Sequence, residues 1–363
     1  MKKIVYLFCS AFLLSGISLS AMQQTAAKNH GAIYYQNHEE RMKKVEGHLQ
    51  MDTRYYDHLS SYAANMYLVG EFLYWTGENG GFATCFDTAD DDNTVFILNR
   101  DFDYGPGFRV GLGFKPPVDW DMFFSYTHFH HTSKEKHTGN LYPYGVPMRG
   151  QMARLKSSFK TKYDMLDVEF GRFFHVGNTL AFKPFFGARG GWIKQKGLSA
   201  GYDAFSVPSP GDPTTPLHYS HDEKLWVIGP RAGFDADLFF SKNYGFSLFG
   251  KFSGALLYGQ ASHRYYSFVT QYQDDPQIQI VIEKDRDDLI ASLQCAAGIS
   301  WGDFLTEGED VALCLRVGWE ANYWWDMYSP LQFFYFEPDE RSLQTVSEAL
   351  LMQGLTVSAR LDF

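Results

Sequence analysis

The chain has 363 residues, of which 17% are aromatic and 20% are charged, and its formal net charge at pH 7 is −10. This aromatic content excludes a disordered chain, because disordered segments lack the apolar surface that offsets the entropy of ordering. The negative net charge argues against a nucleic-acid partner, since phosphate binding requires a basic surface.

The first 21 residues have the pattern of a cleaved secretory signal peptide. Lys2 and Lys3 precede an apolar run over 4–19, which ends at the small residues Ser20 and Ala21. We therefore expect secretion across the inner membrane with loss of residues 1–21. No later stretch approaches the roughly 18 apolar residues of a spanning helix, so the mature chain would have to cross a membrane with strands.

Residues 22–64 are predicted to form a periplasmic segment that contains an amphipathic helix. Within 29–64 apolar residues recur at heptad-like spacing, namely at Met42, Val45, Leu49, Tyr56, Leu59 and Ala63. This spacing is typical of a helix with one apolar face. Two roles remain open, a coil that joins copies into a homo-oligomer, which we favour, and a plug folded toward a lumen.

From residue 65 to residue 363 the chain alternates between apolar and polar residues with a period of two, as half-exposed strands do. In the segment 108–114, for example, every even residue is apolar and Arg109 falls on the opposite face. Ten such segments occur, at 68–75, 108–114, 119–127, 166–171, 180–189, 226–238, 246–256, 293–301, 311–320 and 355–363.

The connections between these segments alternate between short and long. The short ones are Lys115–Pro117, His175–Gly177, Ser241–Asn243 and Gly302–Gly308, and the five long ones are 77–104, 132–158, 195–222, 260–286 and 327–350. Outer-membrane barrels have short periplasmic turns and long outer loops. The sequence therefore predicts an all-β fold, a transmembrane antiparallel up-and-down barrel of ten strands over 65–363, with twelve strands as the alternative.

The polar face of the predicted strands carries twelve charges, which would line the lumen or pore. They are Glu71, Arg109, Asp167, Glu169, Lys183, Arg189, Arg231, Asp235, Lys251, Arg316, Glu320 and Arg360. A soluble β-sandwich would have to bury these charges in its core at prohibitive cost. We expect a narrow lumen braced by charges, since ten strands exceed only slightly the number that side chains fill.

Turn positions give a predicted register for some of these residues. A turn centred near residue 175 places Asp167 opposite Lys183, and a turn centred near residue 243 places Asp235 opposite Lys251. Cys295 and Cys314 are predicted to be symmetric about the turn at 302–308, yet alternation places Cys295 on the lipid face and Cys314 on the lumen face. We expect no bond between them, because directly opposed residues on neighbouring strands point to the same side. Cys85, in the first long loop, is expected to be free or intermolecular.

Several segments resemble a known family of outer-membrane proteins. They are Gly70–Trp75, Tyr126–Phe129, Leu166–Arg172, Pro184–Ile193, Gly229–Gly233 and Leu256–Gly259. They look like the pore-forming major-outer-membrane-protein-like group of legionellae and chlamydia-like bacteria. Over about 65–363 the resemblance implies an abundant porin-like barrel for passive diffusion of small solutes, and it carries no catalytic residues.

The predicted function is thus an outer-membrane porin-like barrel that also braces the envelope and is not an enzyme. Its expected partners are outer-membrane lipid and the barrel-assembly machinery, which would read the terminal aromatic residue Phe363. An adhesin or structural barrel without an open pore is the alternative. A phospholipase reading of His131-Thr132-Ser133 with Asn140 is the least favoured, because Lys134-Glu135 replaces the expected Asn-Gly.

No cofactor or metal is predicted. Four histidines, His128, His130, His131 and His137, gather at one strand top, but they lack an acidic or thiol complement and are interpreted as girdle and loop polarity. The run Asp90–Asp92 could bind Ca²⁺ and is interpreted as a solvated, anion-repelling loop.

Overall fold

The computed structural model describes fourteen stretches of the chain beyond residue 65. They are 66–79, 83–88, 95–99, 103–115, 120–143, 152–176, 179–204, 217–240, 245–270, 276–305, 311–328, 331–337, 340–345 and 348–363. The predicted signal peptide 1–21, the predicted helical segment 22–64 and Asp90–Asp92 lie outside the described residues. Among the described residues no helix is long and apolar enough to cross a membrane.

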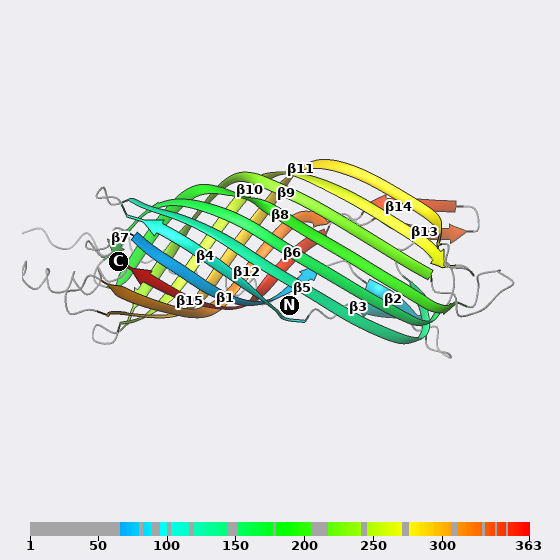
Figure 1. Cartoon of the computed structure of the whole chain (residues 1–363), viewed down its shortest axis with the longest axis horizontal. Helices are drawn as coiled ribbons and strands as arrows, with labels where there is room; N and C mark the ends of the chain where they lie inside the picture. The colour runs from blue at the N-terminus through cyan, green and yellow to red at the C-terminus, as the bar shows by residue number, and fades with distance from the viewer. Residues whose placement is uncertain are drawn as a thin grey trace, which may run out of the picture. The chain divides into compact units, whose positions relative to one another are not determined.

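Ten antiparallel strands form a closed barrel in the described part of the chain (Figure 1). In ring order they are β1 (Met66–Asn79), β4 (Gly105–Phe114), β5 (Trp120–Pro143), β6 (Met152–Arg172), β8 (Leu180–Ala204), β9 (Leu217–Phe239), β10 (Phe246–Thr270), β11 (Pro276–Phe304), β12 (Ala312–Tyr328) and β15 (Glu348–Asp362). Pairing of β15 with β1 closes the ring. The predicted barrel of ten strands is confirmed, and the alternative of twelve is wrong.

Four short strands form hairpins outside this ring, and a fifth continues the ladder of β6. β2 (Ala83–Thr88) and β3 (Val95–Asn99) form a hairpin that pairs with the far end of β5. β13 (Leu331–Glu337) and β14 (Glu340–Thr345) form a second hairpin, and β7 (Phe174–Val176) pairs with the start of β8. The first and last long connections thus contain hairpins that add no strand to the wall.

The chain end completes the seam of the barrel. The backbone N–H of Phe363 donates to the carbonyl of Met66 over 3.0 Å, and the N–H of Met66 donates back over 3.3 Å. The Phe363 ring is half exposed on the outer side of the wall. The residue predicted as an assembly signal therefore sits where the last strand meets the first.

The outer side of the wall carries a band of exposed apolar residues with an aromatic edge. On β9 the outward residues are apolar from Leu238 to Trp226, and the next outward residue is Lys224. Trp226 lies opposite Trp192, and its indole N–H donates to the Gln260 side chain over 3.1 Å. Interfacial aromatics of this kind mark the edge of the hydrocarbon layer, so strand segments beyond Trp226 lie outside the membrane-spanning part.

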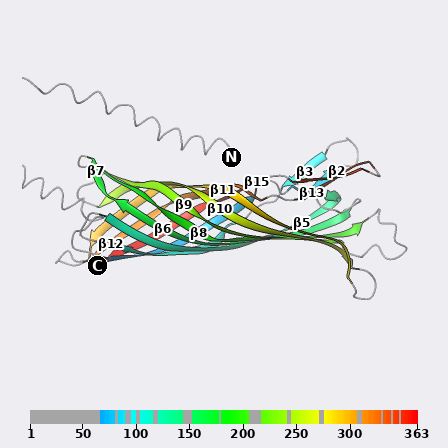
Figure 2. The same ribbon diagram turned by 90° about the horizontal axis from the view of Figure 1, so that it is seen from above.

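Six strands continue well past this edge. β5, β6 and β8–β11 have 21 to 29 residues, whereas roughly 9–11 tilted residues cross a membrane. Figures 1 and 2 show them running beyond the ends of β1 and β15. Much of the predicted outer loops at 132–158, 195–222 and 260–286 is therefore strand, because cross-strand pairing continues beyond the lipid band.

One of the two predicted register assignments is wrong and the other is confirmed. Asp167 lies opposite Arg189 and not Lys183, because β7 extends the ladder and moves the centre of the turn from 175 to 178. Lys251 lies opposite Asp235, as predicted from the turn at 243.

The register predicted for the two cysteines is also wrong. Cys295 lies opposite Ala321, and Cys314 lies opposite Gly302, so the pair is not symmetric about the turn as assumed. Cys314 faces the lumen, and no disulfide joins Cys295 to Cys314. The predicted absence of a bond between them is confirmed, although the assumed register was wrong.

Gly113 shows how closely the inner side chains approach the wall. A Cβ atom at this position would stand 1.9 Å from the Tyr67 ring. Tyr67 cannot easily move aside, because it is buried, donates to Asp121 over 2.7 Å and stacks on Phe123 at 5.7 Å. By contrast, a Cβ at the outward-facing Gly70 would meet no atom within 4 Å.

We predict that Gly113→Ala lowers the free energy of unfolding by about 1–3 kcal/mol, the usual range for overpacking a filled site. Gly70→Ala is the matched control and should leave it nearly unchanged. Urea unfolding of both variants in lipid vesicles measures the difference. Equal stability of the two variants would contradict the contact between Tyr67 and Gly113.

Candidate functional site

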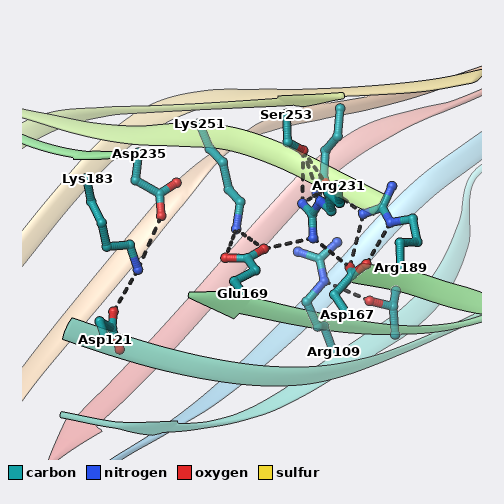
Figure 3. Close-up of polar contacts among 12 residues, drawn as sticks. Arg109, Asp121, Asp167, Glu169, Lys183, Arg189, Arg231, Asp235, Lys251 and Ser253 are labelled. Carbon is teal, nitrogen blue, oxygen red and sulfur yellow. Dashed lines mark hydrogen bonds and ion pairs between the residues drawn. The ribbon is translucent and has the colours of Figure 1, made fainter. Parts of the chain in front are cut away.

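The predicted charges gather inside the barrel. Eleven of the twelve line one cavity of about 110 Å³, and the twelfth, Arg189, lies beside it on Asp167. The residues of this charged layer come from β1, β4, β6, β8, β9, β10, β12 and β15, so they surround the lumen. Figure 3 shows the members of the layer on β4, β6, β8, β9 and β10. Alternation along the strands accounts for this common side.

The centre of the charged layer is a pair of carboxylates on β6. Asp167 accepts two hydrogen bonds from the Arg189 guanidinium, over 2.7 and 3.0 Å. Arg231 contacts both carboxylates, with 3.0 Å to Asp167 and 2.7 Å to Glu169. Lys251 adds a contact of 3.1 Å to Glu169. These contacts come from four strands, and Figure 3 shows them as one connected group.

A second group belongs to the neighbouring part of the wall. Arg109 on β4 pairs with Glu71 over 2.5 Å and with Glu320 over 2.8 Å. The Gln294 amide connects this group to the first, because its N–H donates to Glu320 over 2.6 Å while its oxygen accepts from Arg231 over 2.6 Å. The connected network therefore reaches across the lumen between strands that are not neighbours.

A third group lies nearer the short turns. Lys183 contacts Asp121 over 2.8 Å and Asp235 over 3.8 Å. Arg316 pairs with Asp237 over 3.0 Å. Nearby, Arg360 and Lys115 both contact Asp362, over 2.6 and 3.1 Å.

Four partners in this layer were not among the predicted site residues. They are Asp121, Asp237, Gln294 and Asp362, and each is at most 3% exposed. The alternation of inward and outward positions along each strand could have identified them, since all four occupy inward-facing positions. Which charges they meet depends on cross-lumen distances, and a sequence does not contain these.

The charges at the centre of the charged layer are paired with one another. Asp167, Glu169, Arg189 and Arg231 are each less than 5% exposed, and each has an oppositely charged partner within 3.0 Å. Removing one partner from a buried pair costs about 3–5 kcal/mol, because the other charge stays buried and unpaired. Such a layer holds the strands of the wall together and leaves a small polar cavity between them.

An apolar layer lies in the lumen next to the charged layer. It consists of buried inward-facing residues on nine strands, namely Leu73, Trp75, Phe129, Tyr163, Met165, Ile193, Leu225, Val227, Ala255, Leu257, Ala261, Ile290, Trp324, Met327, Leu350 and Met352. The rings of Tyr163 on β6 and Trp324 on β12 meet at 5.9 Å between centroids. These strands lie on opposite sides of the ring, so this contact spans the lumen.

The predicted histidine group does not form one cluster. His128 and His130 point to the outer side, where His128 contacts Asp164 over 2.7 Å. His131 is buried on the inner side, and so is Ser133. The phospholipase hypothesis requires a histidine and serine that reach lipid, and the structure places both on the lumen side of β5.

A different set of residues brings possible metal ligands together. His221, Glu223 and His263 are all buried, and their ligand atoms lie within 4.8 Å of one another. They follow the aromatic edge outward on β9 and β10. Burial lowers the pKa of His221 to about 3, with a smaller effect of His263, and raises the pKa of Glu223 well above its ordinary value.

Solved structures with a similar arrangement are outer-membrane barrels of low sequence identity. The outer membrane protease OmpT from Escherichia coli is 9% identical, with 83% of this chain and 97% of that chain covered and a TM-score of 0.35. Neisserial surface protein A is 11% identical, with 82% of this chain and 97% of that chain covered and a TM-score of 0.27. The toluene transporter TodX of P. putida is 12% identical, with 84% of this chain and 91% of that chain covered and a TM-score of 0.29. These likenesses concern architecture and transfer no activity.

Among curated proteins no sequence matches this chain. The family described as Legionella pneumophila major outer membrane protein precursor matches residues 61–363, which include every barrel strand. The predicted resemblance and the outer-membrane location are thereby confirmed. The chain belongs to the family of this major outer membrane protein and is a ten-stranded barrel of the bacterial outer membrane.

Proposed function

We propose that this barrel is a porin-like channel for small ions and polar solutes, closed at rest by its apolar layer, and a brace for the envelope. The observation that carries the proposal is the polar cavity inside the wall, lined by eleven charged side chains. A barrel with a structural role alone has no need of a charged cavity, since an apolar filling would avoid the desolvation of these charges.

The apolar layer is the barrier in this proposal. Hydrophobic constrictions gate channels because water and ions leave a narrow apolar passage. In the described residues the contact between Tyr163 and Trp324 crosses this passage, and both side chains are at most 2% exposed. Solute would pass when the apolar layer rearranges, while the charged layer keeps the wall intact.

A second candidate function is supported by the strand extensions. Six strands continue past the aromatic edge, so the protein presents an extended sheet on the outer side of the membrane. A surface barrel that binds a partner through this sheet, without conducting, matches the adhesin alternative. The two candidates differ in one property, which is ion conduction after the apolar layer is opened.

We predict that Trp324→Ala increases ion conductance across planar bilayers severalfold, because it removes the side chain that spans the lumen. Trp325→Ala is the matched control, since Trp325 is the adjacent residue on β12 and is exposed on the outer side. Its conductance should equal that of the unaltered protein. If the Trp324→Ala barrel is folded and still does not conduct, the channel proposal is wrong and the surface-barrel candidate stands.

We also predict that Arg231→Met lowers the free energy of unfolding by about 3–5 kcal/mol, because Asp167 and Glu169 then lose a shared buried partner. Arg264→Met is the control, as Arg264 pairs with Glu283 on the exposed part of the sheet, where ion pairs contribute little. Denaturant unfolding in vesicles compares the two. A small effect of Arg231→Met would remove the bracing role from the charged layer.

A further inference from the structure

The group formed by His221, Glu223 and His263 stands apart from the charged layer. His221 and Glu223 are two positions apart on β9, so both side chains point to the inner side of the wall. His263 lies opposite Glu223 in the ladder between β9 and β10. Leu225, the next inward residue on β9, already belongs to the apolar layer. The group therefore lies just outside that layer, toward the outer face of the membrane.

The side chains converge on one point. The His263 Nδ1 atom and a Glu223 carboxylate oxygen are 4.0 Å apart, and one ligand atom from each of the three residues falls within 4.8 Å of the others. The His221 ring stacks on the buried Tyr265 ring, with 4.5 Å between their centroids. This packing holds one imidazole in place on a rigid strand.

The Glu223 carboxylate is the observation that points to a ligand. The residue is 0% exposed, and among the described residues neither carboxylate oxygen accepts a hydrogen bond. A buried polar group without a hydrogen bond is costly, and a buried carboxylate is more so. The cation acting on it, Arg286, is itself paired with Asp288. A bound cation would satisfy this carboxylate directly.

We propose that His221, Glu223 and His263 form a binding site for a divalent transition metal, with Zn²⁺ as the best match. Two imidazoles and one carboxylate are the protein ligands of many zinc sites that keep a fourth position open for water or solute. Tetrahedral zinc with bonds near 2.1 Å needs ligand atoms about 3.4 Å apart, so these side chains would close by about 1.4 Å at most. Alkaline-earth cations fit less well, because they prefer a full set of oxygen ligands.

Such a site would have a defined place in the barrel. It would bridge β9 and β10 where these strands leave the membrane, directly beyond the apolar layer. The open fourth position would face the interior of the extended sheet. The inference rests on this local geometry alone, and it holds whether or not the barrel conducts.

Zinc binding to the folded, full-length mature barrel in detergent tests the proposal. Equilibrium dialysis against micromolar Zn²⁺, followed by elemental analysis, should find about one zinc per chain. Glu223→Gln and His263→Gln should each weaken binding by more than about tenfold, since even groups behind the ligands change metal affinity by about 10- to 100-fold. His130→Gln is the matched control, because His130 is exposed on the outer side of β5.

Two further measurements keep the result clear of folding defects. Zinc should raise the melting temperature of the unaltered barrel and of His130→Gln, but not that of Glu223→Gln, because a ligand of the native state stabilises it. Co²⁺ in place of zinc should give the visible absorption of a tetrahedral site in the same two proteins. No bound zinc at micromolar concentration, or equal binding by folded Glu223→Gln, would overturn the proposal.

Discussion

The closed wall is the constraint from which the rest of this structure follows. In a membrane every backbone N–H and C=O must be paired, so the ten strands form a ring without an edge. Side chains must then alternate between lipid and a lumen of fixed width. A ten-stranded lumen is narrow enough for one pair of large rings, such as Tyr163 and Trp324, to span it. Charged residues on opposite walls are equally within reach of one another.

The side of the wall that each residue faces was predictable from the sequence, because alternation along a strand does not depend on where the strand ends. Register was less predictable, because it depends on the centre of each turn. Moving one centre from 175 to 178 moves the partner of Asp167 by twice that amount, from Lys183 to Arg189 (189 − 183 = 6). The ladder between β9 and β10 is centred on position 243, as the sequence predicted, so Lys251 and Asp235 were matched correctly. Strand faces thus follow from local pattern, whereas partners require the positions of the turns.

The apolar layer and the group of His221, Glu223 and His263 could not be predicted from the sequence, for different reasons. Leu256 and Leu257 are adjacent and both apolar. Alternation predicts that Leu256 faces outward, but it does not predict that Leu257 belongs to an apolar layer inside the lumen. His221 and His263 fell in segments interpreted as loops, because strands were expected to end at the membrane edge. Depth within a barrel and the length of a strand outside the membrane are set by tertiary pairing, which a period of two does not encode.

The charged layer and the apolar layer have different physical properties, although they lie next to each other in the lumen. The charges of the charged layer pair with one another between strands, and breaking one buried pair is costly, so this layer contributes cohesion to the wall. In the proposed channel the apolar layer is the barrier, because it offers no ligands to replace the hydration shell of an ion. A substitution that removes a large ring from the apolar layer opens space in the lumen. A substitution that removes Arg231 from the charged layer leaves two buried carboxylates without their shared partner. Under the proposed function, permeability depends on the apolar layer, whereas stability depends on the charged layer.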